Sequence, residues 1–282
     1  MTFKIDSKLH WTEHYVEHGF CVIQGVVDED FIEPAIEEIQ SAIGHDLPLP
    51  QWTTNNTPQR SPVPVSTYRH LPTIYDQPGI RDILNTMFAP SHQWNGERAF
   101  QVFINPYQED IETPVLPKVG HIDFVECPIP IFGSGFMFQV SLVKTEPFSG
   151  NITIYPGTHQ KIQRALACNP DLQYRTDPII EQLLKAEPFE FVADPGDVLL
   201  FHHLVGHQGN VSHAAGRSPR LALHCQANCE QWLRELDPAD KNLSPWERSL
   251  TFTGGSYRTR RDEEAWVQEF HKNRTAEPAA AA

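Results

Sequence analysis

The sequence lacks the features of several large classes of protein. No apolar run approaches the roughly 18 residues that span a bilayer, and the first residues lack the basic-then-apolar layout of a signal peptide. Basic residues are outnumbered, with 22 Lys and Arg against 36 Asp and Glu, which gives a formal net charge of −14. Affinity that comes from neutralising phosphates is therefore not expected. These absences predict a soluble, cytoplasmic protein that binds neither nucleic acid nor a membrane.

Disulfide spacing and internal repeats are also absent. The five cysteines form an odd set without a framework pattern, which predicts free thiols in a reducing compartment. Apolar residues make up 40% of the 282 residues, enough for a globular core, and no linker divides the chain. We therefore expect one domain over residues 1–282. Its core covers about 15–227, a helical extension about 229–272, and a disordered tail 275–282.

Short segments with β-strand character dominate the middle of the chain. The expected strands are 99–105, 136–144, 151–155, 189–193, 198–203 and 220–228, separated by turn residues. Before them, residues 19–25 indicate a strand and residues 31–43 a helix behind an acidic first turn, whereas 46–72 has no period and indicates a long loop. A further helical pattern ends near residue 184. Many short strands with turn signals are typical of an all-β sandwich or barrel.

Two histidines and one aspartate are candidate metal ligands. His121 and Asp123 are two residues apart, so on a strand their side chains point to the same face. His207 follows an apolar strand, just beyond its end. Two histidines and one carboxylate on one face of a metal are the ligand set of non-haem Fe(II) oxygen chemistry. His203 remains an alternative to His207 as the third ligand.

A candidate cationic site follows the last of these histidines. Residues 220–228 alternate so that Arg220, His224 and Gln226 share one face of the expected strand. An inward-facing arginine is costly unless a carboxylate meets it, and no acidic partner lies nearby in sequence. A dicarboxylate cosubstrate would supply that partner through a bidentate pair. Arg217 remains an alternative to Arg220 in this role.

Five segments together carry a family resemblance. They are Tyr15-x3-Gly19-Phe-x-Val-Ile-x-Gly25, Gly120-His-Ile-Asp123, Thr145-x4-Gly150-Asn-Ile-Thr-Ile-Tyr-Pro-Gly-Thr-His159, Gly196-Asp-Val-Leu-Leu-Phe-x5-His207, and Gly209-Asn-x-Ser212 followed by Pro219-Arg220. In this order they resemble the phytanoyl-CoA dioxygenase (PhyH) family, ectoine hydroxylase-like members included. The resemblance implies a double-stranded β-helix, the cupin-like jelly roll, with flanking α-helices. It also implies Fe(II), 2-oxoglutarate as cosubstrate, and O2.

The resemblance assigns roles to particular residues. The iron ligands, which are also the catalytic residues, match His121, Asp123 and His207. The positions that bind or neighbour 2-oxoglutarate match Arg220, Gln101, Asn105 and Gln139. Relatives have a tighter Gly-Ser-x-x-Asn-x-Ser run after the last iron ligand, and this departure is why Arg217 stays an alternative.

The implied activity is hydroxylation of an unactivated C–H bond in a small-molecule metabolite, with release of succinate and CO2. Family members that halogenate lack the carboxylate that Asp123 matches, so hydroxylation is favoured, with desaturation or rearrangement left open. A jelly-roll zinc hydrolase or isomerase would use the same ligands without needing Arg220. A binding module without turnover is a third possibility. Substrate specificity is expected in the loops at 46–72, 107–119 and 160–186.

Overall fold

The structure is a computed structural model, and it describes most of the predicted core. The described residues are 10–44, 59–61, 63–105, 115–118, 120–122, 135–168, 178–210, 220–229 and 236–251. The helices are α1 (Trp11–His18), α2 (Glu29–Ile43), α3 (Pro78–Phe88), α5 (Thr158–Cys168), α6 (Pro178–Leu183) and α7 (Pro245–Arg248), with 3-10 turns η1 (Val65–Thr67) and η2 (Leu71–Asp76). Within these ranges, no helix has both the length and the apolar character that a membrane crossing requires.

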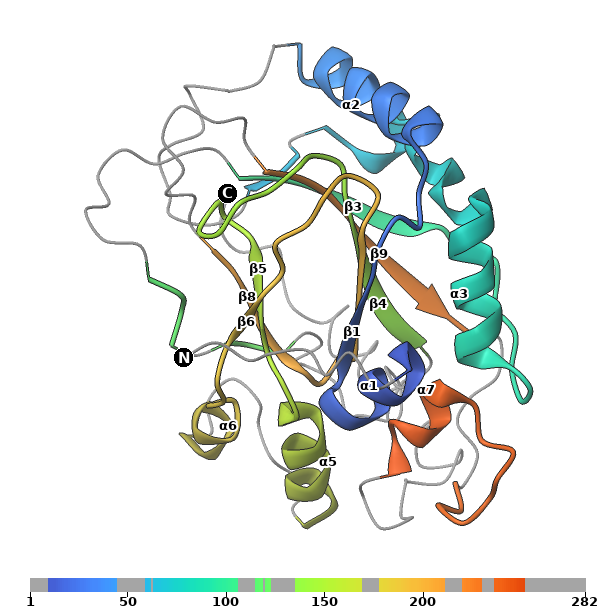
Figure 1. Cartoon of the computed structure of the whole chain (residues 1–282), viewed down its shortest axis with the longest axis vertical. Helices are drawn as coiled ribbons and strands as arrows, with labels where there is room; N and C mark the ends of the chain where they lie inside the picture. Colours follow the sequence, from blue (N-terminus) through green and yellow to red (C-terminus); the bar gives the residue numbers. More distant parts are fainter. Residues whose placement is uncertain are drawn as a thin grey trace, which may run out of the picture.

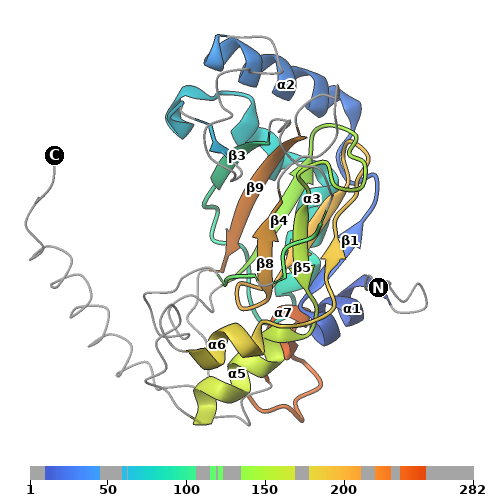
Figure 2. The same cartoon turned by 90° about the vertical axis from the view of Figure 1, so that its left-hand side faces the viewer.

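Two antiparallel sheets form the core. Their strands are β1 (Phe20–Ile23), β2 (Gln59–Arg60), β3 (Ala99–Asn105), β4 (Gly135–Ser141), β5 (Ile152–Tyr155), β6 (Phe189–Glu190), β7 (Val198–Phe201), β8 (Gly206–Gly209) and β9 (Arg220–Asn228). The six-stranded sheet has the order β1-β7-β4-β9-β3-β2 and the three-stranded sheet the order β6-β5-β8. From β4 to β9 the chain passes between the sheets four times, and this winding brings distant strands together (Figures 1 and 2).

The outer face of the six-stranded sheet packs against helices. Phe100, Phe138 and Leu223 lie on this face and join one buried cluster with the apolar sides of α2 and α3. Figure 1 shows α3 along this side of the sheet. The helical side chains involved recur at three- and four-residue spacing, as in Ile80, Ile83, Leu84 and Met87 of α3. Burial of these groups is the main source of the fold's stability.

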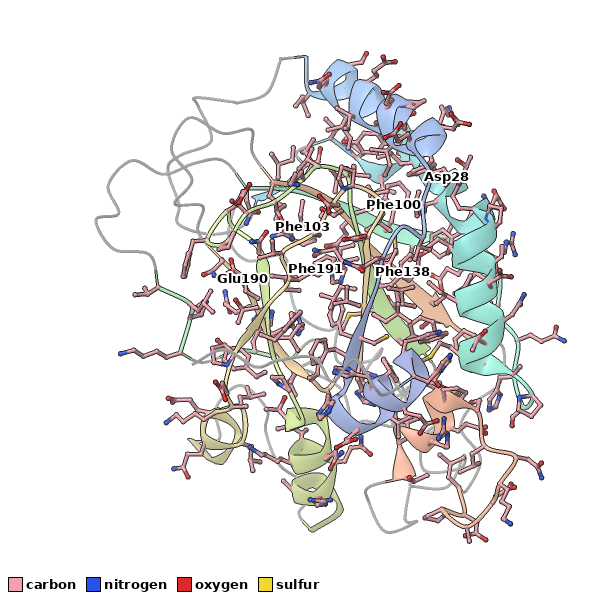
Figure 3. All side chains as sticks on the ribbon, in the orientation of Figure 1. Asp28, Phe100, Phe103, Phe138, Glu190 and Phe191 are labelled. Atoms are coloured by element: carbon pink, nitrogen blue, oxygen red, sulfur yellow. The ribbon has the colours of Figure 1, made fainter. Side chains whose placement is uncertain are left out.

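The inner face of the six-stranded sheet is directed at the three-stranded sheet. Met137, Leu199 and Phe201 pack there against Ile152 and Ile154 of β5 in a second buried cluster. Figure 3 separates the two faces, with Phe191 on the inner side and Phe100 and Phe138 on the side of α3. An apolar core between two sheets fixes how they face each other, and it therefore fixes which strand ends can meet.

The strand predictions agree with the structure where the side chains alternate. Strands β3 and β9 have the predicted bounds, and β4, β5, β6 and β7 lie within or overlap the predicted segments. Part of the segment at 46–72, expected to be a loop, forms β2, η1 and the start of η2. The helix α3 and the strand β8 were not predicted. The expected tail at 275–282 and most of the expected helical extension lie outside the described residues.

Candidate metal and cosubstrate site

His121 and His207 lie side by side, although 86 residues separate them in sequence. Each residue's N–H donates to the other's backbone carbonyl, at 2.9 Å both ways, so the two form an isolated antiparallel bridge. Their ring centroids are 4.6 Å apart. His207 is a residue of β8 and is buried, whereas His121 is exposed. The structure thus brings together the two histidines that the sequence proposed as ligands.

A close backbone approach holds the His121 segment against the three-stranded sheet. A Cβ atom at Gly120 would lie 2.7 Å from the Tyr155 ring and 2.8 Å from the His207 nitrogen, so only glycine fits there. The Tyr155 hydroxyl donates to the Pro117 carbonyl at 2.6 Å. The glycine before His121 is therefore required by packing, and it lets the two histidines meet.

Hydrogen bonds fix the tautomer of both imidazoles. His121 Nδ1 lies 2.9 Å from Gln208 Oε1, and His207 Nδ1 lies 3.1 Å from the Val205 carbonyl. Both partner oxygens can only accept, so each Nδ1 carries the proton and each Nε2 carries the lone pair. A neutral imidazole with its lone pair on Nε2 is a metal ligand. Gln208 was not singled out in the sequence, because its contact with His121 depends on closure of the fold.

The third expected ligand, Asp123, lies outside the described residues. Among the residues that are described, no group of three or more His, Cys, Asp or Glu side chains is placed to hold a metal ion. His203, the alternative to His207, is buried and its ring stacks on His202 with centroids 4.4 Å apart. The bridge to His121 is made by His207, so the geometry favours His207 as the ligand.

Arg220 is a buried cation at the first position of β9. Its Nη1 donates to the Gly150 carbonyl and its Nη2 donates to Gln139 Oε1 at 3.0 Å. Both acceptors are neutral, and no carboxylate pairs with Arg220 in the part of the chain that the structure describes. Burial lowers the pKa of Arg220 to about 10, so the guanidinium still carries its charge at neutral pH. Arg217, the alternative, lies outside the described residues.

Asn105 ties the two sheets together beside this arginine. Asn105 is the register partner of Arg220 across β3 and β9. Its Nδ2 donates to the Gly150 carbonyl at 2.7 Å and to the Asn210 carbonyl at 2.8 Å, at the ends of β5 and β8. Its Oδ1 is buried and has no hydrogen-bond partner among the described residues. With both amide hydrogens used on backbone oxygens, Asn105 shapes the arginine site by holding the Gly150 carbonyl.

A polar row crosses the inner face between the arginine and the histidines. Gln101 of β3, His224 of β9 and Gln139 of β4 are register partners on three neighbouring strands. The His224 ring meets Phe201 edge-on at 5.4 Å between centroids, and Phe201 meets the His207 ring at 5.1 Å. Gln101 and His224 are only partly buried. The structure therefore places Gln101, Gln139 and Arg220 on one face and connects that face to His207 through Phe201.

The arrangement has specific chemical capacities. Two imidazole nitrogens side by side can ligate a divalent metal, and imidazole suits iron, zinc, nickel and copper. A buried guanidinium without a carboxylate partner in the described ranges is suited to a carboxylate or phosphate, which it can bind through two parallel N–H donors. Arg220 and the Phe201 ring that contacts His207 both lie on the inner face of the six-stranded sheet.

Comparisons with known proteins yielded structural matches alone. No family model matches the sequence, and no curated protein does either. The non-heme alpha-ketoglutarate-dependent epimerase SnoN from nogalamycin biosynthesis is similar, with a TM-score of 0.55 and 16% identity over 77% of this chain and 81% of that chain. The carbocyclase SnoK from the same biosynthesis has a TM-score of 0.55 and 14% identity, over 79% of this chain and 84% of that chain.

A third similar structure is HygX from Streptomyces hygroscopicus, solved with nickel and 2-oxoglutarate bound. Its TM-score is 0.50 at 13% identity, over 83% of this chain and 92% of that chain. At such identities the likeness concerns the fold. The predicted fold class is confirmed: the chain is a double-stranded β-helix, or jelly roll, with an antiparallel β core and flanking helices.

Proposed function

We propose that this protein is an Fe(II)- and 2-oxoglutarate-dependent dioxygenase that hydroxylates an unactivated C–H bond of a small-molecule metabolite. The observation that carries the proposal is Arg220, a buried cation whose described partners are all neutral. Leaving a buried charge uncompensated costs several kcal/mol. An anionic cosubstrate would offset that cost, and one carboxylate of 2-oxoglutarate fits a guanidinium through a bidentate pair.

The metal would be held by His121 and His207 through Nε2, with Asp123 as the third ligand that the sequence supplies. The Nδ1–H hydrogen bonds of both histidines already set the tautomer that such ligation needs. Fe(II) bound there would supply O2 activation at the expense of 2-oxoglutarate, which is released as succinate and CO2. Two histidines and a carboxylate leave coordination positions open for cosubstrate and O2.

The protein's own contribution is orientation and exclusion of water. Arg220 would anchor the far carboxylate of 2-oxoglutarate, while Gln139 and the Gly150 carbonyl hold the guanidinium in place. Asn105 holds the same carbonyl and Asn210, which keeps the two sheets together at this end. A buried site strengthens the ion pair because the surrounding dielectric is low. Phe201, packed against His207, would supply an apolar wall beside a metal bound there.

A zinc-dependent hydrolase or isomerase would use the same histidines and activate water. That alternative leaves Arg220 without a function, because a metal that activates water does not need a buried guanidinium. The similar structures also favour the oxygenase: SnoN and SnoK are described as alpha-ketoglutarate dependent, and HygX holds 2-oxoglutarate. These similarities support the proposal of an oxygenase over that of a hydrolase or isomerase.

The substrate is proposed to be a small metabolite such as an amino-acid derivative or a natural-product intermediate. The net charge of −14 opposes the approach of an acyl-CoA polyanion, although a local basic rim could offset it. Hydroxylation is the proposed outcome because Asp123 matches, by motif resemblance, the carboxylate that halogenating members of the resembled family lack. SnoN is an epimerase and SnoK a carbocyclase, so the test must identify the product in addition to measuring turnover.

The test is succinate release from the Fe(II)-loaded protein with a panel of free acids, amines and their CoA thioesters, at low and physiological salt. We expect release above the substrate-free background with a small acid or amine, together with a product 16 mass units heavier than the substrate. If only the CoA thioesters were turned over, and salt weakened that turnover, the substrate would be an acyl-CoA and not a free small metabolite. No 2-oxoglutarate consumption under any condition, with bound zinc and hydrolytic activity, would overturn it.

A further inference from the structure

Gln208 contacts the exposed member of the histidine pair from the strand of the buried one. It follows His207 on β8, and its side-chain Oε1 lies 2.9 Å from His121 Nδ1. Its Nε2 donates to the Gly209 carbonyl at 3.3 Å, which turns the amide so that the oxygen faces His121. Gln208 is also the register partner of the buried Thr153 on β5. One side of the amide is thus anchored in β8 and the other meets the imidazole.

The hydrogen bond determines which nitrogen of His121 can bind a metal. An amide oxygen has no hydrogen to donate, so His121 Nδ1 must be the donor and Nε2 keeps the lone pair. A neutral histidine without such an acceptor populates both tautomers and can present either nitrogen. His207 receives the same constraint from the Val205 carbonyl, which is a backbone group. At His121 the constraint comes from a side chain, and it can be removed by substitution.

We propose that Gln208 is a positioning residue for the metal site, acting through His121, and this inference rests on the metal-binding function proposed above. Gln208 holds the His121 ring in orientation and tautomer so that Nε2 is presented beside His207. This matters more at His121 than at His207, because His121 is exposed and belongs to an isolated bridge instead of a strand. Groups that hold ligating histidines through the second ring nitrogen change metal affinity by about 10- to 100-fold when removed.

The experiment titrates the purified full-length chain with Co(II) and follows the visible absorption of the bound ion. The variants are Gln208→Leu, which removes the acceptor at nearly constant size, and Gln208→Glu, which keeps an acceptor at the same position. The matched control is Gln160→Leu: it makes the same change on α5, where Gln160 donates to the Glu17 carbonyl at 2.7 Å. We expect Gln208→Leu to weaken Co(II) binding about 10- to 100-fold. Gln208→Glu should bind Co(II) at least as tightly as wild type does. Gln160→Leu should have the same Co(II) affinity as wild type.

A second readout needs no metal. Proton–nitrogen correlation spectra of the histidine side chains report which ring nitrogen carries the proton, and His121 is assigned by its loss in His121→Ala. We expect an Nδ1-protonated His121 in wild type and Gln208→Glu, and a mixture of tautomers in Gln208→Leu. If Gln208→Leu fails to fold, Gln208→Glu decides, and weaker Co(II) binding by that variant overturns the proposal.

The failure of this inference can be told apart from failure of the proposed function. Unchanged Co(II) affinity and an unchanged His121 tautomer in Gln208→Leu would reject the role of Gln208 while leaving the metal site intact. Wild-type protein that binds Co(II) no better than His121→Ala would reject the metal site itself. In that case the tautomer spectra would still show whether Gln208 orients His121.

Discussion

The two faces of the six-stranded sheet differ in chemistry. On the outer face, the five neighbouring strands β1, β7, β4, β9 and β3 contribute apolar side chains to one buried cluster. These side chains include Cys21, Leu200, Val140, Leu223 and Val102. The inner face is apolar on β1 and β7, whereas β4, β9 and β3 also carry polar side chains there, beside apolar ones such as Met137. These polar side chains are Gln139, Arg220, His224, Gln101 and Asn105. The same strands therefore carry a continuous apolar core on one side and the candidate site on the other.

This difference shows how stability and chemistry are divided. Among the described residues, the buried Arg220 cation has only neutral partners and the buried Asn105 amide oxygen has no hydrogen bond, and both features are costly. The apolar outer face supplies stability that the polar inner face does not, at roughly 25 cal/mol per Å² of apolar surface buried. Alternation along β9 places the two roles on adjacent residues, as at Leu223 and His224. Substitutions on the two faces should therefore have separable effects.

The largest effect is expected at the three proposed metal ligands. His121→Ala, Asp123→Ala and His207→Ala should each abolish turnover while leaving the fold largely intact, because no side chain of the outer cluster is lost. Metal content and circular dichroism of each purified variant provide the measurement. Activity that survives in His207→Ala but is lost in His203→Ala would show that the other histidine is the ligand.

A substitution on the outer face should have the opposite outcome. Leu223→Ala removes a fully buried side chain and should lower the free energy of unfolding by about 2–5 kcal/mol. Activity per folded molecule should stay close to wild type, since the side chain points away from the site. His224→Ala, on the next residue of the same strand, is the matched comparison and should reduce stability less and activity more. Urea unfolding gives the stabilities of both variants. If both variants lost equal stability and equal activity, the proposed division between the two faces would be wrong.

A smaller effect is expected from buried histidines near α5. Burial lowers the pKa of His159 to about 3, and nearby His18, His203 and Arg164 act in the same direction against the Val16 carbonyl, which raises it. The pKa of His202 is lowered by burial as well. These residues stay neutral in the folded chain but bind protons when unfolded below about pH 6.5. The stability that depends on these neutral histidines is therefore fully present above about pH 6.5, and it is lost progressively as the pH falls toward 3.

The pH prediction can be tested with one variant. Each such histidine contributes about 1.4 kcal/mol per pH unit over that range. In His159→Gln, the slope of unfolding free energy against pH should be smaller by about that amount between pH 6 and 5. Urea titrations at both values give the slope. The same slope in both proteins would mean that His159 is not held neutral by its surroundings.

Much of the fold could be predicted from local patterns. The alternation in β3 and β9 is strong because one face is apolar and the other polar, so both strands were predicted with their observed bounds. The strand β8 was missed because Gly206 and Gly209 flank two polar residues, and pairing with β5 stabilises it instead of its own propensity. The helix α3 begins at Pro78 and was not predicted, although its buried residues recur at helical spacing.

The site could be predicted only in its residue types. Spacing and motif resemblance predicted His121 and His207 as metal ligands and Arg220 as the anion-binding residue. The fold brings the two histidines together. The contacts that position them could not be predicted, because they join residues 87 positions apart, as between His121 and Gln208, or 81 apart, as between Arg220 and Gln139. Such contacts are set by sheet closure and by a backbone approach at Gly120, neither of which a local pattern contains.

Binding of 2-oxoglutarate to the Fe(II)-loaded protein without O2 tests the central claim most directly, with wild type compared against Arg220→Met and Arg217→Met. Removing one partner of a buried charge pair costs about 2–5 kcal/mol, so Arg220→Met should weaken binding about 30- to 5,000-fold. Arg217→Met should cost less than about 1 kcal/mol, the range of an exposed ion pair. Without cosubstrate, Arg220→Met should be at least as stable as wild type, because a desolvated cation is removed. Equal effects of the two substitutions, or a larger one at Arg217, would contradict the account.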